Sequence, residues 1–91
     1  MNAPRRKKLQ KILEAIEELK SQLEDQQTDL EEINDDEQSA FCNIPETLSG
    51  SERYERAEAA ATALEDAYDT LSDIVSSLED LTNSIEEAIE A

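Results

Sequence analysis

Apolar residues recur at alternating steps of three and four along almost the whole 91-residue chain. This spacing predicts long amphipathic helices, because it keeps the apolar side chains on one face of an α-helix. In residues 4–43 two rows follow the repeat and are expected to face a partner helix. One row is Leu9, Ile16, Leu23, Leu30, Glu37 and Ile44, and the other is Ile12, Leu19, Gln26, Ile33 and Ala40, with Leu13 and Phe41 widening the seam at its ends.

Residues 51–90 carry the same repeat with one row more. A pair of helices in a coiled coil covers two rows on each helix, so a third apolar row needs another partner. We expect self-association or a partner helix to cover it. The two seam rows are Tyr54, Ala61, Tyr68, Val75, Thr82 and Ile89, and Ala57, Leu64, Leu71, Leu78 and Ile85; the third row is Ala60, Ala67, Ile74, Leu81 and Ala88.

Between these two segments lies the one stretch with turn chemistry, NIPETLSG over 43–50. Pro45 disfavours helical geometry at the residue before it. Asn2 or Ala3 is expected to cap the first helix, while Ser49 with Glu52 forms a capping box for the second and Ser51 is the competing cap. The chain is therefore predicted to be one all-α domain: a helix over about 4–43, a loop over about 44–50 and a helix over about 51–90. These form an antiparallel two-helix coiled-coil hairpin, for which dimerisation into a four-helix bundle is the expected next step.

Charge changes this picture, because 24 acids face only eight bases and the net charge is −16. Five of the bases lie within residues 5–11, and no base occurs in 21–52 or in 57–91. In an antiparallel hairpin the basic start lies beside Glu86, Glu87 and Glu90. Ion pairing there would relieve two unfavourable helix-dipole arrangements, so we favour it over a basic docking tip.

The rest of the hairpin is then a negative rod, and a groove that binds nucleic acid should attract it. Acidic outer faces often serve solubility alone, but ordinary coiled coils interleave both signs, and here Lys is nearly absent from the outer faces of the predicted helices. A basic protein that binds nucleic acid is therefore the expected partner, alongside a homodimer. The predicted partner-binding acids are Glu24, Asp25, Glu31, Glu32, Asp35, Asp36, Glu65, Asp66, Asp69, Asp73, Glu79 and Asp80.

The residues needed for catalysis or metal binding are missing from the sequence. Cys42 has no His to activate it and no second Cys with which to bind zinc, and one Gly does not make a phosphate loop. We therefore expect no enzyme activity, no cofactor and no metal. The acidic charge argues against direct nucleic-acid binding. No run is long and apolar enough for a membrane span, acids interrupt the segment after Arg5–Lys8 where a signal peptide needs an apolar core, and a lone thiol suits a reducing cytosol.

The centre of the chain, FCNIPETLSGSERYE over 41–55, follows RRKKLQKILEAIEELKSQL over 5–23 and precedes an acidic, Leu- and Ile-rich tail. This combination resembles small acidic helical proteins encoded by phages and other mobile elements of Gram-positive bacteria. The resemblance covers nearly the whole chain and implies no particular activity. Small acidic phage proteins include inhibitors of host defence nucleases, among them DNA mimics of the anti-CRISPR and anti-restriction kinds. The most specific positions are Pro45, Glu46, Leu48, Ser51, Glu52 and Arg53.

Two functions are compatible with these patterns. The leading hypothesis is a non-enzymatic acidic protein that blocks a basic nucleic-acid-binding surface of a host protein, such as a defence nuclease. The alternative is a structural or adaptor coiled coil that binds another helix, or itself, through the third row of residues 51–90.

Overall fold

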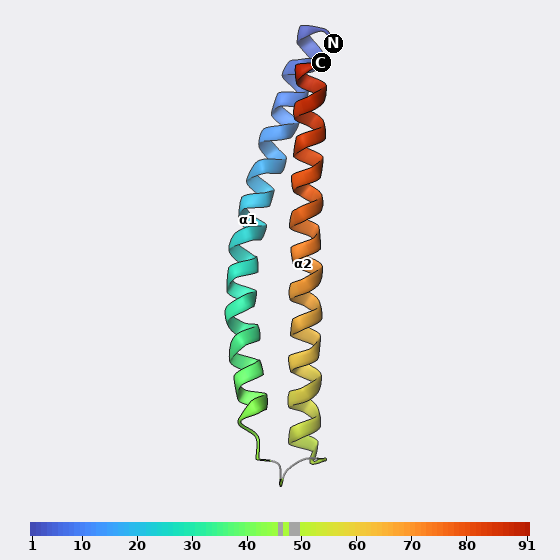
Figure 1. The fold of residues 1–91 in the computed structure, drawn as a ribbon. Helices are drawn as coiled ribbons and strands as arrows, with labels where there is room; N and C mark the ends of the chain where they lie inside the picture. Colours follow the sequence, from blue (N-terminus) through green and yellow to red (C-terminus); the bar gives the residue numbers. More distant parts are fainter. Residues whose placement is uncertain (46, 48–49) are drawn as a thin grey trace.

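The chain folds as a hairpin of two long helices. The computed structural model describes residues 1–45, 47 and 50–91. Helix α1 (Ala3–Cys42) and helix α2 (Glu52–Glu90) run antiparallel, and the two ends of the chain lie together at one end of the molecule (Figure 1). The molecule measures 69 × 16 × 14 Å. The predicted hairpin of two packed helices is confirmed, and all regular structure of the described residues is helical.

Local side-chain bonds set where each helix begins. The Asn2 Oδ1 atom accepts a hydrogen bond from the backbone N–H of Arg5 at 3.0 Å, and Pro4 occupies the first turn, where its missing N–H costs nothing. Helix α2 begins after Ser51, whose Oγ accepts from the backbone N–H of Tyr54 at 3.2 Å. Ser51, which the sequence offered as the alternative to Ser49, is thus the N-cap of α2.

The favoured cap, Ser49, lies outside the described residues, as do Glu46 and Leu48. Gly50 precedes the Ser51 cap with φ of 87°, a conformation that glycine adopts without steric cost.

The predicted seam of α2 does face α1. Ala61 and Thr82 are buried, with 4% and 6% of their surface exposed, and the other members of the two predicted rows are half-buried. The Thr82 hydroxyl donates to the backbone oxygen of Glu79 at 2.8 Å, so its burial leaves no polar group unsatisfied. Helix α2 therefore sits as its heptad pattern predicts.

The predicted second row of α1 is wrong. Leu13 is buried at 5% exposure, whereas Ile12, Leu19 and Ile33 are 49%, 54% and 52% exposed. The row that contains Leu9 does face α2. The second seam row, however, is the one that contains Leu13 and not the one that contains Ile12, because this rotation of α1 places the large Leu13 and Phe41 between the helices. The Phe41 ring contacts the Tyr54 ring, with centroids 5.1 Å apart. The companion row is Leu13, Lys20, Gln27, Asn34 and Phe41.

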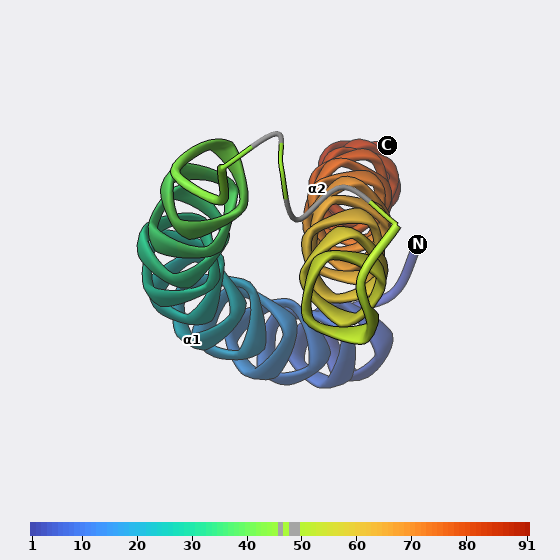
Figure 2. The same ribbon diagram turned by 90° about the horizontal axis from the view of Figure 1, so that it is seen from below.

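Helix α1 also curves around α2 along its length (Figure 2). Such a sweep is expected when a seam repeats every seven residues, because a straight helix would let the seam drift away from its partner. The rows on either side of the seam therefore stay on the same side of the hairpin from end to end.

Candidate functional site

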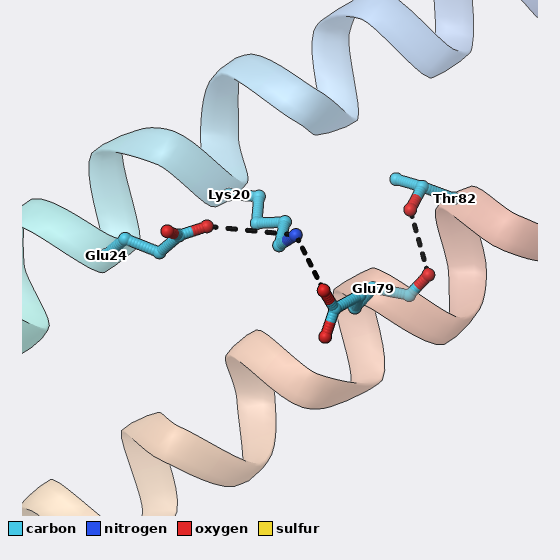
Figure 3. Close-up of polar contacts among 4 residues, drawn as sticks. All are labelled: Lys20, Glu24, Glu79 and Thr82. Carbon is cyan, nitrogen blue, oxygen red and sulfur yellow. Dashed lines mark hydrogen bonds and ion pairs between the residues drawn. The ribbon is translucent and has the colours of Figure 1, made fainter.

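Polar bonds between the helices identify one side of the hairpin. The Lys20 Nζ atom lies 3.8 Å from Glu24 Oε1 on its own helix and 3.4 Å from Glu79 Oε1 on α2 (Figure 3). One turn further towards the loop, the Gln27 Nε2 donates to the Ser72 Oγ at 2.8 Å. The flanks of α1 and α2 that carry these residues therefore meet along one edge of the seam.

Exposed glutamates line both helices along this edge. Residues seven apart lie nearly on one line of a helix, so Glu24 belongs to a row of α1 and Glu79 to a row of α2. Every glutamate of the two rows is exposed. We call this surface the carboxylate face; it consists of Glu17, Glu24 and Glu31 from α1 and Glu58, Glu65, Glu79 and Glu86 from α2.

All twelve acids predicted to bind a partner are exposed, but they do not form one array. By helical position, four of them lie on the carboxylate face and most of the others point away from the opposite helix. Two of the four, Glu24 and Glu79, are partly neutralised by Lys20. Glu24, Glu31, Glu65 and Glu79 lie on the face; Asp35, Asp66, Asp69, Asp73 and Asp80 extend it towards the outer sides of the helices; Asp25 and Glu32, seven residues apart, share the outer row of α1 that points away from α2, and Asp36 lies towards the opposite face.

The expected pairing of the basic start with the acids at the end of α2 is not found. Within the described residues, no ion pair joins residues 5–11 to Glu86, Glu87 or Glu90. Arg6 instead donates to the main-chain oxygen of Ala91 at 3.0 Å. Ion pairs of the described chain lie elsewhere, at Lys20 and between Arg56 and Glu52 one helical turn apart.

The opposite side of the seam is apolar and exposed. Besides Met1, all exposed large apolar side chains in the described part of the chain lie there: Ile12, Leu19 and Ile33 on α1, and Ile74 and Leu81 on α2. The rows they belong to follow the seam along its whole length. We call this surface the apolar face; it consists of Ile12, Leu19, Gln26, Ile33 and Ala40 together with Ala60, Ala67, Ile74, Leu81 and Ala88.

A groove of about 520 Å³ lies at the middle of the apolar face. Leu19 and Leu23 line it from α1, Ile74 and Leu78 line it from α2, and the polar side chains of Gln22, Asp25 and Gln26 border it. The groove shows that the two apolar rows lie side by side on the same surface.

Sequence reasoning found half of the apolar face. The predicted third row of α2 is exposed, except that Ala88 is half-buried. The matching row of α1 was missed because it was assigned to the seam. Its signal was present in Leu13 and Phe41, which compete with that row for the space between the helices.

Charge is distributed unequally between the two faces. On α2, the row next to the apolar one contains only small neutral residues from position 63 onward: Ala63, Thr70, Ser77, Ser84 and Ala91. This side of α2 therefore carries no charge over four heptads, in a chain of net charge −16.

Three further features of the described residues lie apart from these two faces or concern the helices as a whole. Cys42 is an exposed free thiol at the loop end, no group of three or more potential ligands is placed to hold a metal ion there, and no described helix combines the length and apolarity that crossing a bilayer requires. Comparisons with protein-family models, with curated proteins and with solved structures find no match.

Proposed function

We propose that this chain is a non-enzymatic acidic binding protein that occupies a basic, nucleic-acid-binding surface of another protein and blocks it. The observation that carries the proposal is the carboxylate face, seven exposed glutamates on a rigid two-helix frame with Lys20 as the one base among them. Along each helix, successive glutamates of a row lie roughly 10 Å apart at 1.5 Å per residue, except that Ser72 interrupts the α2 row and leaves roughly 21 Å between Glu65 and Glu79. A fixed array of this kind resembles the regular charges of a nucleic-acid backbone.

The negative charge is concentrated towards the loop. Residues 1–22 and 72–91 contain six bases and nine acids, a net charge of −3, whereas residues 23–71 contain two bases and fifteen acids, a net charge of −13. If the loop half takes half of the 69 Å length, it has about one net charge per 2.7 Å, against one per ~1.7 Å for duplex DNA. This half is therefore the better mimic of nucleic acid.

A positively charged groove should bind such a rod for the same physical reasons that it binds DNA. Binding releases the counterions of both surfaces, and the charge of the groove steers the rod towards it. The resemblance to small acidic phage proteins suggests a host defence nuclease of the restriction or CRISPR kind as the partner.

Affinity capture tests this function with a matched pair of variants. The purified hairpin is immobilised and exposed to a lysate of Gram-positive bacteria at low salt, and captured proteins are identified and then challenged with duplex DNA. Glu31→Lys with Glu65→Lys reverses two charges on the carboxylate face near the loop. Glu18→Lys with Glu87→Lys makes the same change in net charge on the outer sides of the helices near the chain ends.

A nucleic-acid-binding protein should be captured by the native chain and by the second variant, released by DNA, and lost with the first variant. Capture that DNA does not displace, and that both variants retain equally, would rule out the proposal.

A second candidate function is favoured by the apolar face. Five large apolar side chains between 43% and 54% exposed are more than a solvated hairpin needs. We propose that this face associates with another helical surface, as an adaptor or as two hairpins forming a four-helix bundle. Ile74→Gln with Leu81→Gln should then abolish association measured by analytical ultracentrifugation. A native chain that stays monomeric and captures no helical protein would exclude this candidate.

A further inference from the structure

We infer that the apolar face is covered by a second copy of this chain, and that the two hairpins pack antiparallel, with the loop of each beside the chain ends of the other. This inference rests on the self-association candidate given above and adds the surface, the orientation and the residues that meet.

The size of the face is sufficient for a stable dimer. One side of the hairpin is 69 Å long and 14 to 16 Å wide, so it presents on the order of 1,000 Å², against ~800 Å² per partner in a standard protein interface. Apart from Gln26, its side chains are Leu, Ile and Ala, whose burial is the main source of association energy. The occupant must cover an apolar surface of the same length, and a second copy supplies a matching one.

The groove marks one level along the two apolar rows. Ile74 is the middle residue of the α2 row, and Leu19 and Gln26 of the α1 row line the same groove, so the level of Ile74 falls between Leu19 and Gln26. A two-fold axis through this groove, perpendicular to the helices, places each row against the same row of the second copy. Ile74 then meets its own equivalent, Ala67 meets Leu81 of the second copy, and Ile12 meets Ile33 of the second copy. The Ala67–Leu81 pair sets a small residue opposite a large one, which favours the interdigitation that close packing requires.

Charge selects this orientation over the parallel one. In a parallel dimer the two loop halves, each with a net charge of −13, would lie side by side. In the antiparallel dimer each of them lies beside a half with a net charge of −3. Because interaction energy follows the product of the charges at a given separation, the antiparallel arrangement carries less than half of the repulsion.

The basic start of α1 also gains partners in this arrangement. With the axis in the central groove, residues 5–11 of one copy lie beside residues 34–40 of the other, which include Asp35, Asp36 and Glu37. Lys8 and Asp36 occupy equivalent rows of α1 next to the apolar one, so they meet across the interface. This accounts for five bases that form no ion pair with the acids of their own α2 in the described structure.

Both carboxylate faces remain on the outside of such a dimer. Each lies on the other side of its own seam from the apolar face, so dimerisation buries none of the seven glutamates. The two carboxylate faces then lie on opposite sides of one rod, which carries twice the negative charge of a single hairpin.

The exposed Cys42 near the loop provides a direct measure of the orientation in the native chain. It lies about 20 residues from the proposed axis, so a rise of 1.5 Å per residue places the two Cys42 residues of an antiparallel dimer about 60 Å apart, and those of a parallel dimer less than about 30 Å apart. Nitroxide labels on Cys42 and double electron–electron resonance measure this distance, while sedimentation equilibrium on the same sample measures the mass.

A dimer with a Cys42 separation near the longer distance supports the inference. A dimer with the shorter distance contradicts the orientation while keeping the self-association candidate. A monomer at all concentrations from micromolar to millimolar contradicts both, and neither of these results bears on binding to a basic partner.

Two further comparisons test the interface itself. Ser77→Glu adds a carboxylate beside the apolar face, and Ser76→Glu adds the same group to the neighbouring exposed residue that points to the other side of α2. The first should weaken dimerisation at least tenfold more than the second, with both variants equally helical. Equal effects would show that the face is not the interface.

Lys8→Glu and Asp36→Lys address the ion pair. Each change alone should weaken the dimer by about three- to tenfold, because two exposed pairs are lost per dimer, and the double variant should recover the native affinity. On one chain these residues are about 40 Å apart along α1 at 1.5 Å per residue, so recovery can only arise between copies. Additive losses in the double variant would refute the pairing.

Discussion

Truncating Leu13 and its neighbour Ile12 distinguishes the observed rotation of α1 from the one that its apolar pattern suggests. Leu13→Ala and Ile12→Ala remove the same number of carbon atoms at consecutive positions. Leu13 is 5% exposed between the helices, whereas Ile12 is 49% exposed on the apolar face. Each variant therefore serves as the matched control of the other.

The expected losses follow from burial. Three methyl or methylene groups at ~0.8 kcal/mol each give about 2.4 kcal/mol for a fully buried side chain. Leu13→Ala should cost about 2 kcal/mol, because Ala regains a few tenths of a kcal/mol in helix propensity. Ile12→Ala should cost about 0.5–0.8 kcal/mol, because half of its side chain is already in water and Ala is the better helix former. For a domain of this size, these losses correspond to decreases in Tm of about 8–16 °C and about 2–6 °C.

Circular dichroism at 222 nm during thermal unfolding measures both losses. The thermal unfolding should be measured at the lowest practical protein concentration, so that lost association through the apolar face does not add to the destabilisation measured for Ile12→Ala. If Ile12→Ala proves as destabilising as Leu13→Ala under these conditions, the row of Ile12, Leu19 and Ile33 faces α2 and the described rotation is wrong.

Three further outcomes follow from the same structure. Ser51→Ala should lower the free energy of unfolding by about 1 kcal/mol in urea titrations, because the N–H of Tyr54 loses its cap; an unchanged midpoint would contradict the cap. Raising NaCl from low to physiological concentration should raise Tm, because screening reduces repulsion in a chain of net charge −16; a fall in Tm would contradict it. Lys20→Met should lower Tm at low salt and much less at high salt, because Glu24 and Glu79 lose their shared cation; a loss that is equal at both salt concentrations would assign Lys20 a packing role instead.

The features that depend on neighbouring residues in the sequence were predictable. Asn2 and Pro4 mark the start of α1, Pro45 and Gly50 mark the turn, and both helices lie within a residue of their predicted bounds. The seam of α2 was also predictable, because its third row contains mostly Ala and its two seam rows contain the larger side chains.

The rotation of α1 was not predictable from the pattern alone. The row that contains Leu9 faces α2 in either rotation. Whether the row of Ile12 or the row of Leu13 completes the seam depends on which α2 side chains lie opposite it. Lys20, Gln27 and Asn34 look unsuitable for a seam, yet Lys20 and Gln27 reach Glu79 and Ser72 with their polar ends while their stems pack between the helices. That the acids are exposed was predictable from their number. Which side of the hairpin each acid of α1 lies on was not, because it depends on the rotation of α1.

The salt dependence of binding to the captured partner tests most directly whether the carboxylates act as a substitute for nucleic acid. The dissociation constant of the native hairpin is measured at several NaCl concentrations, with Glu31→Lys/Glu65→Lys and Glu18→Lys/Glu87→Lys alongside. If the carboxylate face replaces phosphates, affinity should fall at least about tenfold between ~50 and ~200 mM salt, and the first variant alone should show a weaker salt dependence. An affinity that does not change with salt, or that is the same for both variants, would contradict the account.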